Sequence, residues 1–350
     1  MTEVSVLLSG GLLCGLLAGA AAQFGRLCTF SAIEDAVLAG DFRRGRAFGL
    51  ALATALLLTQ TLAALNLVSL TGNPYDHARI ELAGLLFGAA LFGLGMSLVG
   101  TCGFGLLMRA GTGDLRALVT AGILGVAAAA ASGGLLSPAR LWIASLLSIP
   151  TDALGWKALQ SASHSVLHMP AQFPVTALVV TALLAVTFGS ARFRKRPKLI
   201  VAGVLLGAAV AGGWIVTGVL ADPFGNHRLE SLTFVGPIAR IVLLTMGETI
   251  HHATFAVGSV LGVAAGSFAV AWRRDELRWE AFDDQREMRR HILGAIFMGL
   301  GGVLAKGCTI GQGLSASSVL AATAPLAILS MIAGARLGLY YLIEGRTYFK

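Results

Sequence analysis

Three cysteines stand where glycine-containing segments interrupt apolar stretches of the chain. They are Cys28, Cys102 and Cys308, and each has a glycine within three residues. Glycine lets the backbone and a solute approach closely, and a neutral thiol is a weak hydrogen-bond donor. Weak contacts at successive sites let a solute both enter and leave. The three thiols therefore predict a path for a soft, polarisable sulfur species.

Other chemistry is less well supported by these residues. A zinc or copper site needs convergent thiolates and imidazoles, and the sequence contains no Cys-x-x-Cys pair, so we expect no metal and no cofactor. A lone buried cysteine usually packs as a small hydrophobe, which is our interpretation of Cys14. The residues predicted to contact solute are Cys28, Cys102, Cys308, Lys306, Gly25, Gly103, Gly105 and Gly311.

Charged residues near these thiols are a second candidate feature. Lys306 lies two residues before Cys308, and a cation at membrane depth is costly enough to indicate a function, here attraction of an anion. Arg26 lies two residues before Cys28 and serves equally well as an interfacial anchor. A further cluster is open to two interpretations, a mutually neutralising network or a proton or gating role for its histidines. Its members are Arg240, Glu248, His251 and His252.

The composition requires these residues to sit in a membrane protein. Of 350 residues, 56% are hydrophobic and 13% are charged, against about 45–50% and about 25% in soluble domains. The 45 glycines agree, because small residues replace hydrophobic collapse in packing membrane helices. A soluble enzyme is excluded, and the net charge of +8 is expected in cytoplasmic loops rather than at nucleic acid.

Apolar periodicity predicts an all-α polytopic fold with nine membrane-spanning helices. Short polar or glycine-rich stretches at 25–38, 102–112, 231–250 and 307–320 are predicted to be re-entrant half-helices, which membranes tolerate where protein shields the backbone. The expected spans are 5–24, 47–70, 80–101, 115–136, 173–190, 199–221, 252–272, 291–306 and 324–343.

The distribution of Lys and Arg predicts the orientation. One set of loops holds 18 basic residues and the other holds four, so the first set is expected in the cytoplasm, with the N-terminus outside and the C-terminus inside. The stretch at 4–22 lacks a preceding positive region, so it is expected to be the first span rather than a signal peptide. Within the basic set, residues 273–290 suit either a helix lying on the inner interface or a solvated connector.

An internal repeat indicates how the spans are organised. With a constant offset of 206, two sets of residues match without a gap. Gly88, Ala89, Gly93, Leu94, Gly95, Leu98, Cys102 and Gly105 recur as Gly294, Ala295, Gly299, Leu300, Gly301, Leu304, Cys308 and Gly311. The expected topology turns the second copy upside down, which predicts one membrane domain of two inverted halves, 1–190 and 199–350, as in many transporters.

The motifs around the cysteines resemble the YeeE/YedE family of bacterial inner-membrane proteins, over essentially the whole chain. The resemblance rests on Phe-Gly-Arg-Leu-Cys-Thr-Phe-Ser-Ala-Ile-Glu-Asp at 24–35, on Leu-Phe-Gly-Leu-Gly-Met at 91–96 with Cys102-Gly103, and on Met-Gly-Leu-Gly at 298–301 with Gly-Cys-Thr-Ile-Gly at 307–311. It implies a thiosulfate importer of the inner membrane, in which Cys28, Cys102 and Cys308 would pass the terminal sulfur along by weak S–H···S bonds.

The resemblance also implies partners and leaves alternatives open. Thiosulfate or a related sulfur anion, the lipid bilayer and a cytoplasmic sulfur-carrier or rhodanese-like protein are the expected partners. A transporter, and not an enzyme, is the favoured class. The alternatives are a membrane-embedded sulfur or selenium relay that works as a sulfurtransferase, and a scaffold whose cysteines only pack.

Overall fold

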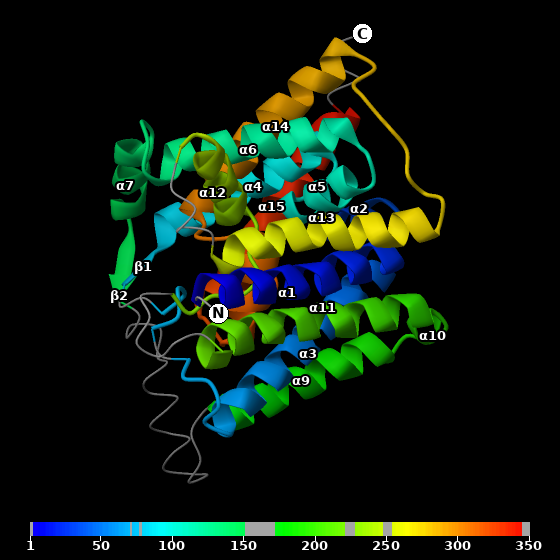
Figure 1. Ribbon diagram of the computed structural model, residues 1–350, viewed down its shortest axis with the longest axis vertical. Helices are drawn as coiled ribbons and strands as arrows, with labels where there is room; N and C mark the ends of the chain where they lie inside the picture. The colour runs from blue at the N-terminus through cyan, green and yellow to red at the C-terminus, as the bar shows by residue number, and fades with distance from the viewer. Residues whose placement is uncertain are drawn as a thin grey trace.

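The computed structural model describes residues 3–70, 72–76, 79–150, 172–220, 228–247 and 254–344, and these are mostly helical (Figure 1). The long helices are α1 (Glu3–Gly25), α3 (Arg43–Ala64), α4 (Leu82–Val99), α6 (Leu115–Ser132), α9 (Gln172–Phe188), α11 (Pro197–Ile215, continued by the π-helical η2, Val216–Leu220), α13 (Phe255–Arg273), α14 (Gln285–Leu304) and α15 (Thr323–Glu344). The short ones are α2 (Thr29–Leu38), α5 (Gly103–Gly111), α7 (Ser137–Ser145), α10 (Ala191–Arg194), α12 (Val235–Thr245) and the π-helical η4 (Gly311–Ala316).

Seven helical stretches in the described part of the chain are long and apolar enough to cross a membrane. The protein is therefore a multi-pass membrane protein. Each expected span overlaps one long helix, but some boundaries were wrong. Helix α3 ends at Ala64 and not near residue 70, because Asn66 turns the chain with a positive φ of 55°. Helix α14 begins at Gln285, six residues earlier than expected.

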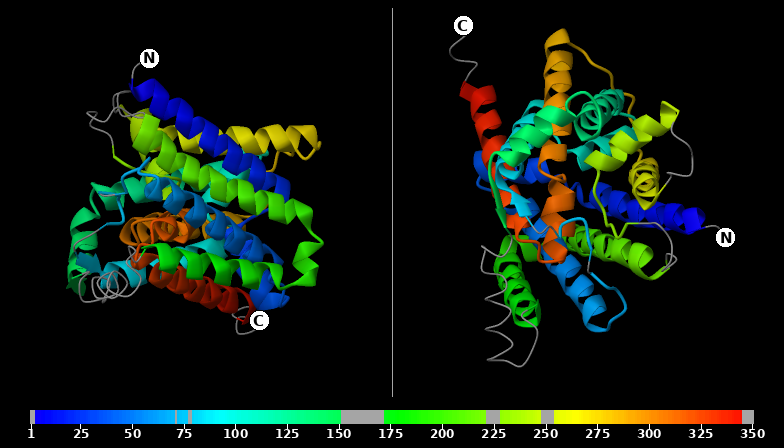
Figure 2. Two further views of the ribbon diagram at one scale, coloured as in Figure 1. Left: turned by 90° about the horizontal axis from the view of Figure 1, so that it is seen from below. Right: turned by 90° about the vertical axis from the view of Figure 1, so that its left-hand side faces the viewer.

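Helix α1 packs on both α11 and α13 and lies between them in Figure 1, and Figure 2 shows the three helices from two other directions. A Cβ added at Gly11, Gly15 or Gly19 would meet the α13 backbone at Phe255, Ser259 and Val263, respectively. Each step of four residues along α1 is thus matched by a step of four residues in the same direction along α13. Helices α1 and α13 are therefore parallel. By contrast, Gly10 approaches Val216 and Gly25 approaches Ala202, so α11 runs antiparallel to α1.

Helices α4 and α14 form the centre of the remaining bundle. Gly88 approaches Leu304 while Gly95 approaches Met298, so these two helices are antiparallel. Outside them, α15 packs on α4 and α6 packs on α14. Small residues let the backbones come this close, which is the usual means of helix association where lipid removes the hydrophobic drive.

The two ends of the long helices differ in character. At one end, called the basic end here, lie the α1–α2, α2–α3, α5–α6, α9–α11 and α13–α14 connections. At the other end two short strands, β1 (Arg79–Glu81) and β2 (Ser148–Pro150), pair antiparallel, which the all-α expectation did not include.

The segment between α13 and α14 is extended at 276–284, so a helix lying on the interface was the wrong interpretation there. The reason is that its backbone pairs with the α5–α6 turn. Arg278 N–H donates to the Thr112 carbonyl, and Leu115 N–H donates to the Glu280 carbonyl. Arg116 forms ion pairs with Glu280 and other carboxylates of this region.

We expect Gly15→Ala to lower the free energy of unfolding by about 1–3 kcal/mol through overpacking. The new Cβ would lie 2.8 Å from the Ser259 carbonyl carbon, and backbone cannot rotate away. The midpoint of thermal unfolding in detergent measures this. Gly122→Ala is the matched control, because a Cβ there meets nothing within 4 Å and helix propensity should leave stability equal or higher. Equal midpoints for both variants would contradict close packing of α1 on α13.

Candidate functional site

The first residues of α2, α5, α12 and η4 meet in the interior of the protein. Cys28 Sγ lies 3.3 Å from Thr101 Oγ1, and Thr233 Oγ1 lies 3.9 Å from Cys308 Sγ. The rings of Phe104 and Phe234 pack with their centroids 5.0 Å apart. Four helix starts from distant parts of the sequence therefore surround one small region.

Each of the three predicted thiols lies directly before a short helix. Cys102 has an extended backbone and its Sγ accepts a hydrogen bond from Gly105 N–H at 3.4 Å. Cys308 Sγ accepts in the same way from Gly311 N–H at 3.4 Å. The first N–H groups of a helix have no partner within it and carry its positive dipole end. The sulfurs therefore sit in a setting that favours negative charge.

The structure brings two of the thiols together and connects the third through a neighbour. The thiols of Cys28 and Cys102 are within hydrogen-bonding reach of each other, and Cys102 is also 3.8 Å from Thr29 Oγ1. The Thr309 side chain, next to Cys308, approaches Cys102. Both Cys102 and Cys308 have 0% exposure, so a solute reaches them only through the protein.

Threonine hydroxyls alternate with the thiols, and sequence reasoning assigned them no role. They belong to Thr29, Thr101, Thr233 and Thr309, each next to a cysteine or to Leu232, which occupies the fourth helix start. Those adjacent Cys-Thr and Thr-Cys pairs were the signal available in the sequence. Among the described residues Gln312 Oε1 is buried with no hydrogen-bond partner, and the buried Thr309 hydroxyl has only the Cys102 thiol in its vicinity. An orphaned buried polar atom is rare and costly, and an oxygen-bearing solute would supply a partner to the Thr309 hydroxyl.

The predicted glycines divide into two groups. A Cβ at Gly105 would lie 3.3 Å from Cys28 Sγ, and one at Gly311 would lie 2.6 Å from Thr233 Oγ1, so these two make room beside the thiols. Gly25 instead approaches Ala202 at 2.5 Å in helix packing, and Gly103 has only Leu124 nearby, at 3.9 Å.

The chain reaches each thiol through a residue with positive φ two positions earlier. These are Arg26 (φ 51°), Gly100 (φ 80°) and Lys306 (φ 54°). Leu27 N–H donates to Ala22 O and Gly307 N–H donates to Gly302 O, the bond that ends a helix with a left-handed residue. Arg26 and Lys306 are thus placed by the same turn at the ends of α1 and α14.

These two cations form ion pairs at opposite ends of the bundle. Arg26 lies 3.0 Å from Glu276 at the basic end. The Arg26 guanidinium holds the pKa of Glu276 below its ordinary value, so Glu276 stays ionised. Lys306 Nζ lies 3.3 Å from Glu81 at the strand end, and its side chain is 30% exposed. Sequence reasoning missed both carboxylate partners, since nothing in the local pattern marks them.

Tyr75 is another residue that the sequence did not single out. Its hydroxyl would lie 3.5 Å from a Cβ on Gly311. Burial raises the pKa of this phenol, with Cys308 and Glu230 nearby adding to the effect. Tyr75 therefore keeps its proton and is a neutral hydrogen-bond donor on the strand side of Cys308.

The remaining candidates lie elsewhere or outside the described residues. Cys14 is buried on α1, 3.1 Å from a Cβ built on Gly212. Arg240 donates to Thr254 Oγ1 at 2.7 Å. Glu248, His251 and His252 fall outside the described ranges. Within those ranges no three His, Cys, Asp or Glu side chains group as a metal site requires.

Comparison with known proteins shows the family of the chain. The family model described as Sulphur transport matches residues 24–337. The thiosulfate transporter TsuA of Spirochaeta thermophila is 29% identical, over 93% of this chain and 96% of its own. The thiosulfate transporter TsuA of Escherichia coli is 26% identical, over 94% and 93%. The chain thus belongs to the Sulphur transport (YeeE/YedE) family of multi-pass membrane proteins.

Proposed function

We propose that this protein imports thiosulfate, or a closely related inorganic sulfur anion, across the bacterial inner membrane along Cys28, Cys102 and Cys308. The observation that carries the proposal is that each of two thiols contacts the hydroxyl beside the other, Cys28 Sγ at 3.3 Å from Thr101 Oγ1 and Cys102 Sγ at 3.8 Å from Thr29 Oγ1. Such a site offers a soft partner to a terminal sulfur and hard donors to sulfonate oxygens. The names of the two similar transporters support the choice of cargo.

The proposed architecture is nine spans in two inverted halves, 1–190 and 199–350. It is supported by the antiparallel course of α1 and α11, and of α4 and α14, which would be equivalent helices. The outer contacts also correspond if α3 is equivalent to α13 and α6 to α15. Helix α1 then packs on α13 as α11 packs on α3, and α4 packs on α15 as α14 packs on α6. In this arrangement the half-helices α2, α5, α12 and η4 are equivalent and meet at the midplane.

We assign the basic end to the cytoplasm, with the N-terminus in the periplasm and the C-terminus inside. Loops at that end carry 18 of the Lys and Arg residues, against four in the others, and positive residues remain on the cytoplasmic side. Lys306 and Glu81 then lie at the periplasmic mouth. An arriving anion would compete with Glu81 for Lys306 before it reaches the thiols.

Import along this path proceeds through weak, successive contacts. The thiols donate S–H bonds to the terminal sulfur while threonine hydroxyls and helix-start N–H groups hold the oxygens. Because each contact is weak, no step traps the anion. A membrane potential that is negative inside the cell opposes entry of each charge of the dianion by about 2.3 kcal/mol per 100 mV. A coupled ion or consumption of thiosulfate in the cytoplasm must supply the drive.

Burial of Cys102 and Cys308 favours this function over a sulfur relay through those two thiols, while Cys28 is only partly buried. A relay must hand sulfur to a carrier protein from an accessible persulfide, whereas Cys102 and Cys308 have 0% exposure. Mass spectrometry of protein purified after thiosulfate exposure tests the difference. Transport leaves the mass unchanged, and a persulfide adds about 32 Da.

Replacing any one of Cys28, Cys102 and Cys308 by alanine should abolish growth of a sulfate-uptake-deficient bacterium on thiosulfate, because each substitution removes one donor from a path with no bypass. Growth rate at matched, verified membrane expression is the measurement. Cys14→Ala is the control and should grow like the parent. Undiminished growth of the three variants would refute the thiol path, and no growth with the intact protein would refute thiosulfate as cargo.

Removing the hydroxyl of Thr101 should slow thiosulfate uptake about tenfold, the cost of roughly one hydrogen bond to an anion. Thr101→Val keeps the side-chain shape, and initial rates of labelled thiosulfate uptake in vesicles measure the effect. Thr61→Val serves as the comparison, since the Thr61 hydroxyl bonds only to the Leu57 carbonyl, at 2.7 Å. Equal rates for both variants would mean that the hydroxyl beside Cys28 does not contact the cargo.

Two substitutions of Lys306 separate its charge from its backbone conformation. Lys306→Gly removes the strain of a non-glycine residue in the left-handed conformation and should raise the free energy of unfolding by about 1 kcal/mol. This gain should exceed the loss of the partly exposed ion pair with Glu81. Lys306→Gln keeps the conformational strain. Both should reduce uptake at low thiosulfate concentration, because both remove the cation. If Lys306→Gly transports normally and Lys306→Gln does not, the residue acts through conformation alone.

A further inference from the structure

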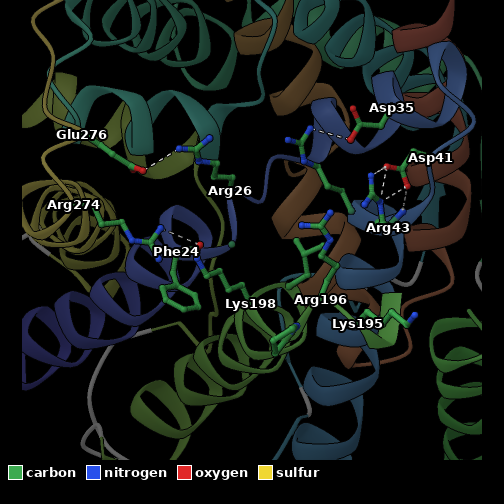
Figure 3. A pocket seen from close by; sticks show the side chains of 14 residues that line it. Phe24, Arg26, Asp35, Asp41, Arg43, Lys195, Arg196, Lys198, Arg274 and Glu276 are labelled. Carbon is green, nitrogen blue, oxygen red and sulfur yellow. Dashed lines mark hydrogen bonds and ion pairs between the residues drawn. The ribbon is translucent and has the colours of Figure 1, made fainter. Parts of the chain in front are cut away.

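A cavity of about 760 Å³ opens at the basic end, beside the ends of α1, α3 and α11 (Figure 3). No thiol lines it, so it is distinct from the cysteine site. It is still close along the chain, because Gly25 and Arg26 line it and directly precede Leu27 and Cys28. Its charged lining consists of Arg26, Arg43, Arg44, Lys195, Arg196, Lys198 and Arg274, with Asp35, Asp41 and Glu276.

All three acidic side chains of this cavity are already engaged. Arg43 lies 2.5 Å from Asp41, and its guanidinium holds the pKa of Asp41 below the ordinary value. Arg44 lies 2.9 Å from Asp35, and the third acid, Glu276, binds the cation at the end of α1. Three of the seven cations are therefore neutralised by local partners.

The other four cations give the cavity a net charge of +4. Across the described part of the chain, no carboxylate lies within 4 Å of Lys195, Arg196 or Lys198. Arg274 donates to the Phe24 carbonyl at 3.3 Å and stacks 4.6 Å from the centre of its ring, which fixes the guanidinium beside the cavity. Figure 3 shows Arg196 and Lys198 in the space between the two groups of ion pairs.

The N-terminus of a 19-residue helix adds to this field. Helix α11 begins at Pro197, its N-cap is Arg196, and no side chain caps it. Pro197 has no N–H group, and the Leu199 N–H donates to the Arg196 carbonyl, so the helix adds its positive dipole end to the cavity rather than a row of free N–H donors. Four cations in excess of the local carboxylates and the uncapped start of a long helix thus line one hollow that opens to solvent, and together they favour an anion there.

We propose that this cavity binds a divalent tetrahedral oxyanion, thiosulfate or sulfate, on the cytoplasmic side of the protein. The proposal rests on the proposed function for its orientation and its cargo. The charged N–H donors of Lys and Arg side chains recognise oxygens, so this site, unlike the thiol path, does not require a terminal sulfur. An imported anion is held here against the cations before release, and cytoplasmic sulfate competes for the same place and slows import.

Equilibrium binding of labelled sulfate to the full chain in nanodiscs of neutral lipid tests the site. The triple variant Lys195→Gln, Arg196→Gln, Lys198→Gln should bind sulfate about tenfold more weakly, as expected for three solvent-screened charges. The triple variant Arg286→Gln, Arg289→Gln, Arg290→Gln removes equal charge from the same end, outside the cavity lining, and should bind like the parent. Equal weakening in both variants, or none in either, overturns the proposal.

Sulfate binding to the double variant Cys28→Ala, Cys102→Ala, measured in the same way, separates this site from the transport proposal. Retained sulfate binding that the cavity triple variant removes supports the site even if thiosulfate uptake by the intact protein is never observed. A lipid phosphate is the other source of such an anion, and basic pockets at the cytoplasmic side can hold it. If neutral nanodiscs bind no sulfate, while cardiolipin copurifies with the parent and not with the cavity variant, the site is a lipid site and the proposal is overturned.

Discussion

Backbone groups without hydrogen-bond partners are not tolerated in lipid, and this protein begins four helices in its buried interior. Side chains at these interruptions bond some of the backbone groups, either within one helix start or between two. Gln312 Nε2 donates to the Ala305 carbonyl at 2.8 Å, Ser315 donates to the Leu232 carbonyl at 2.6 Å, and Cys102 accepts from Gly105 N–H. The interruptions that create the site are therefore stabilised by local side-chain bonds at Gln312 and Cys102 and by the Ser315 bond that joins two helix starts.

That constraint explains the density of small residues around the site. For four helix starts to meet, the long helices that carry them must approach to backbone contact, as Gly15 does on α13 and Gly95 does on α14. Larger side chains would hold the helices apart and leave the interior groups without partners. Packing and function thus depend on the same glycines, and a substitution far from the thiols can damage the site through helix separation.

Sequence reasoning predicted the parts that depend on local pattern. Apolar length predicted the long helices, and glycine with cysteine marked three of the four helix starts. It could not predict which side chains meet across the bundle. The approach of Thr309 to Cys102, the ion pair of Lys306 with Glu81 and the extended course of 276–284 are all set by tertiary contacts. Helix ends such as α3 shifted because one left-handed residue, Asn66, outweighs several apolar neighbours.

Under the proposed function, the distribution of charge follows from the cost of moving a dianion. A cation fixed at the buried centre would be expensive to desolvate and, once paired with the cargo, would release it slowly. Here the cations nearest the thiols along the chain, Arg26 and Lys306, form ion pairs at opposite ends of the bundle, and the interior offers thiols and hydroxyls. Strong attraction then acts where water screens it, while weak contacts act where water is absent. In the proposed import, this division would let an anion be collected at one end and released at the other without a deep energy minimum between them.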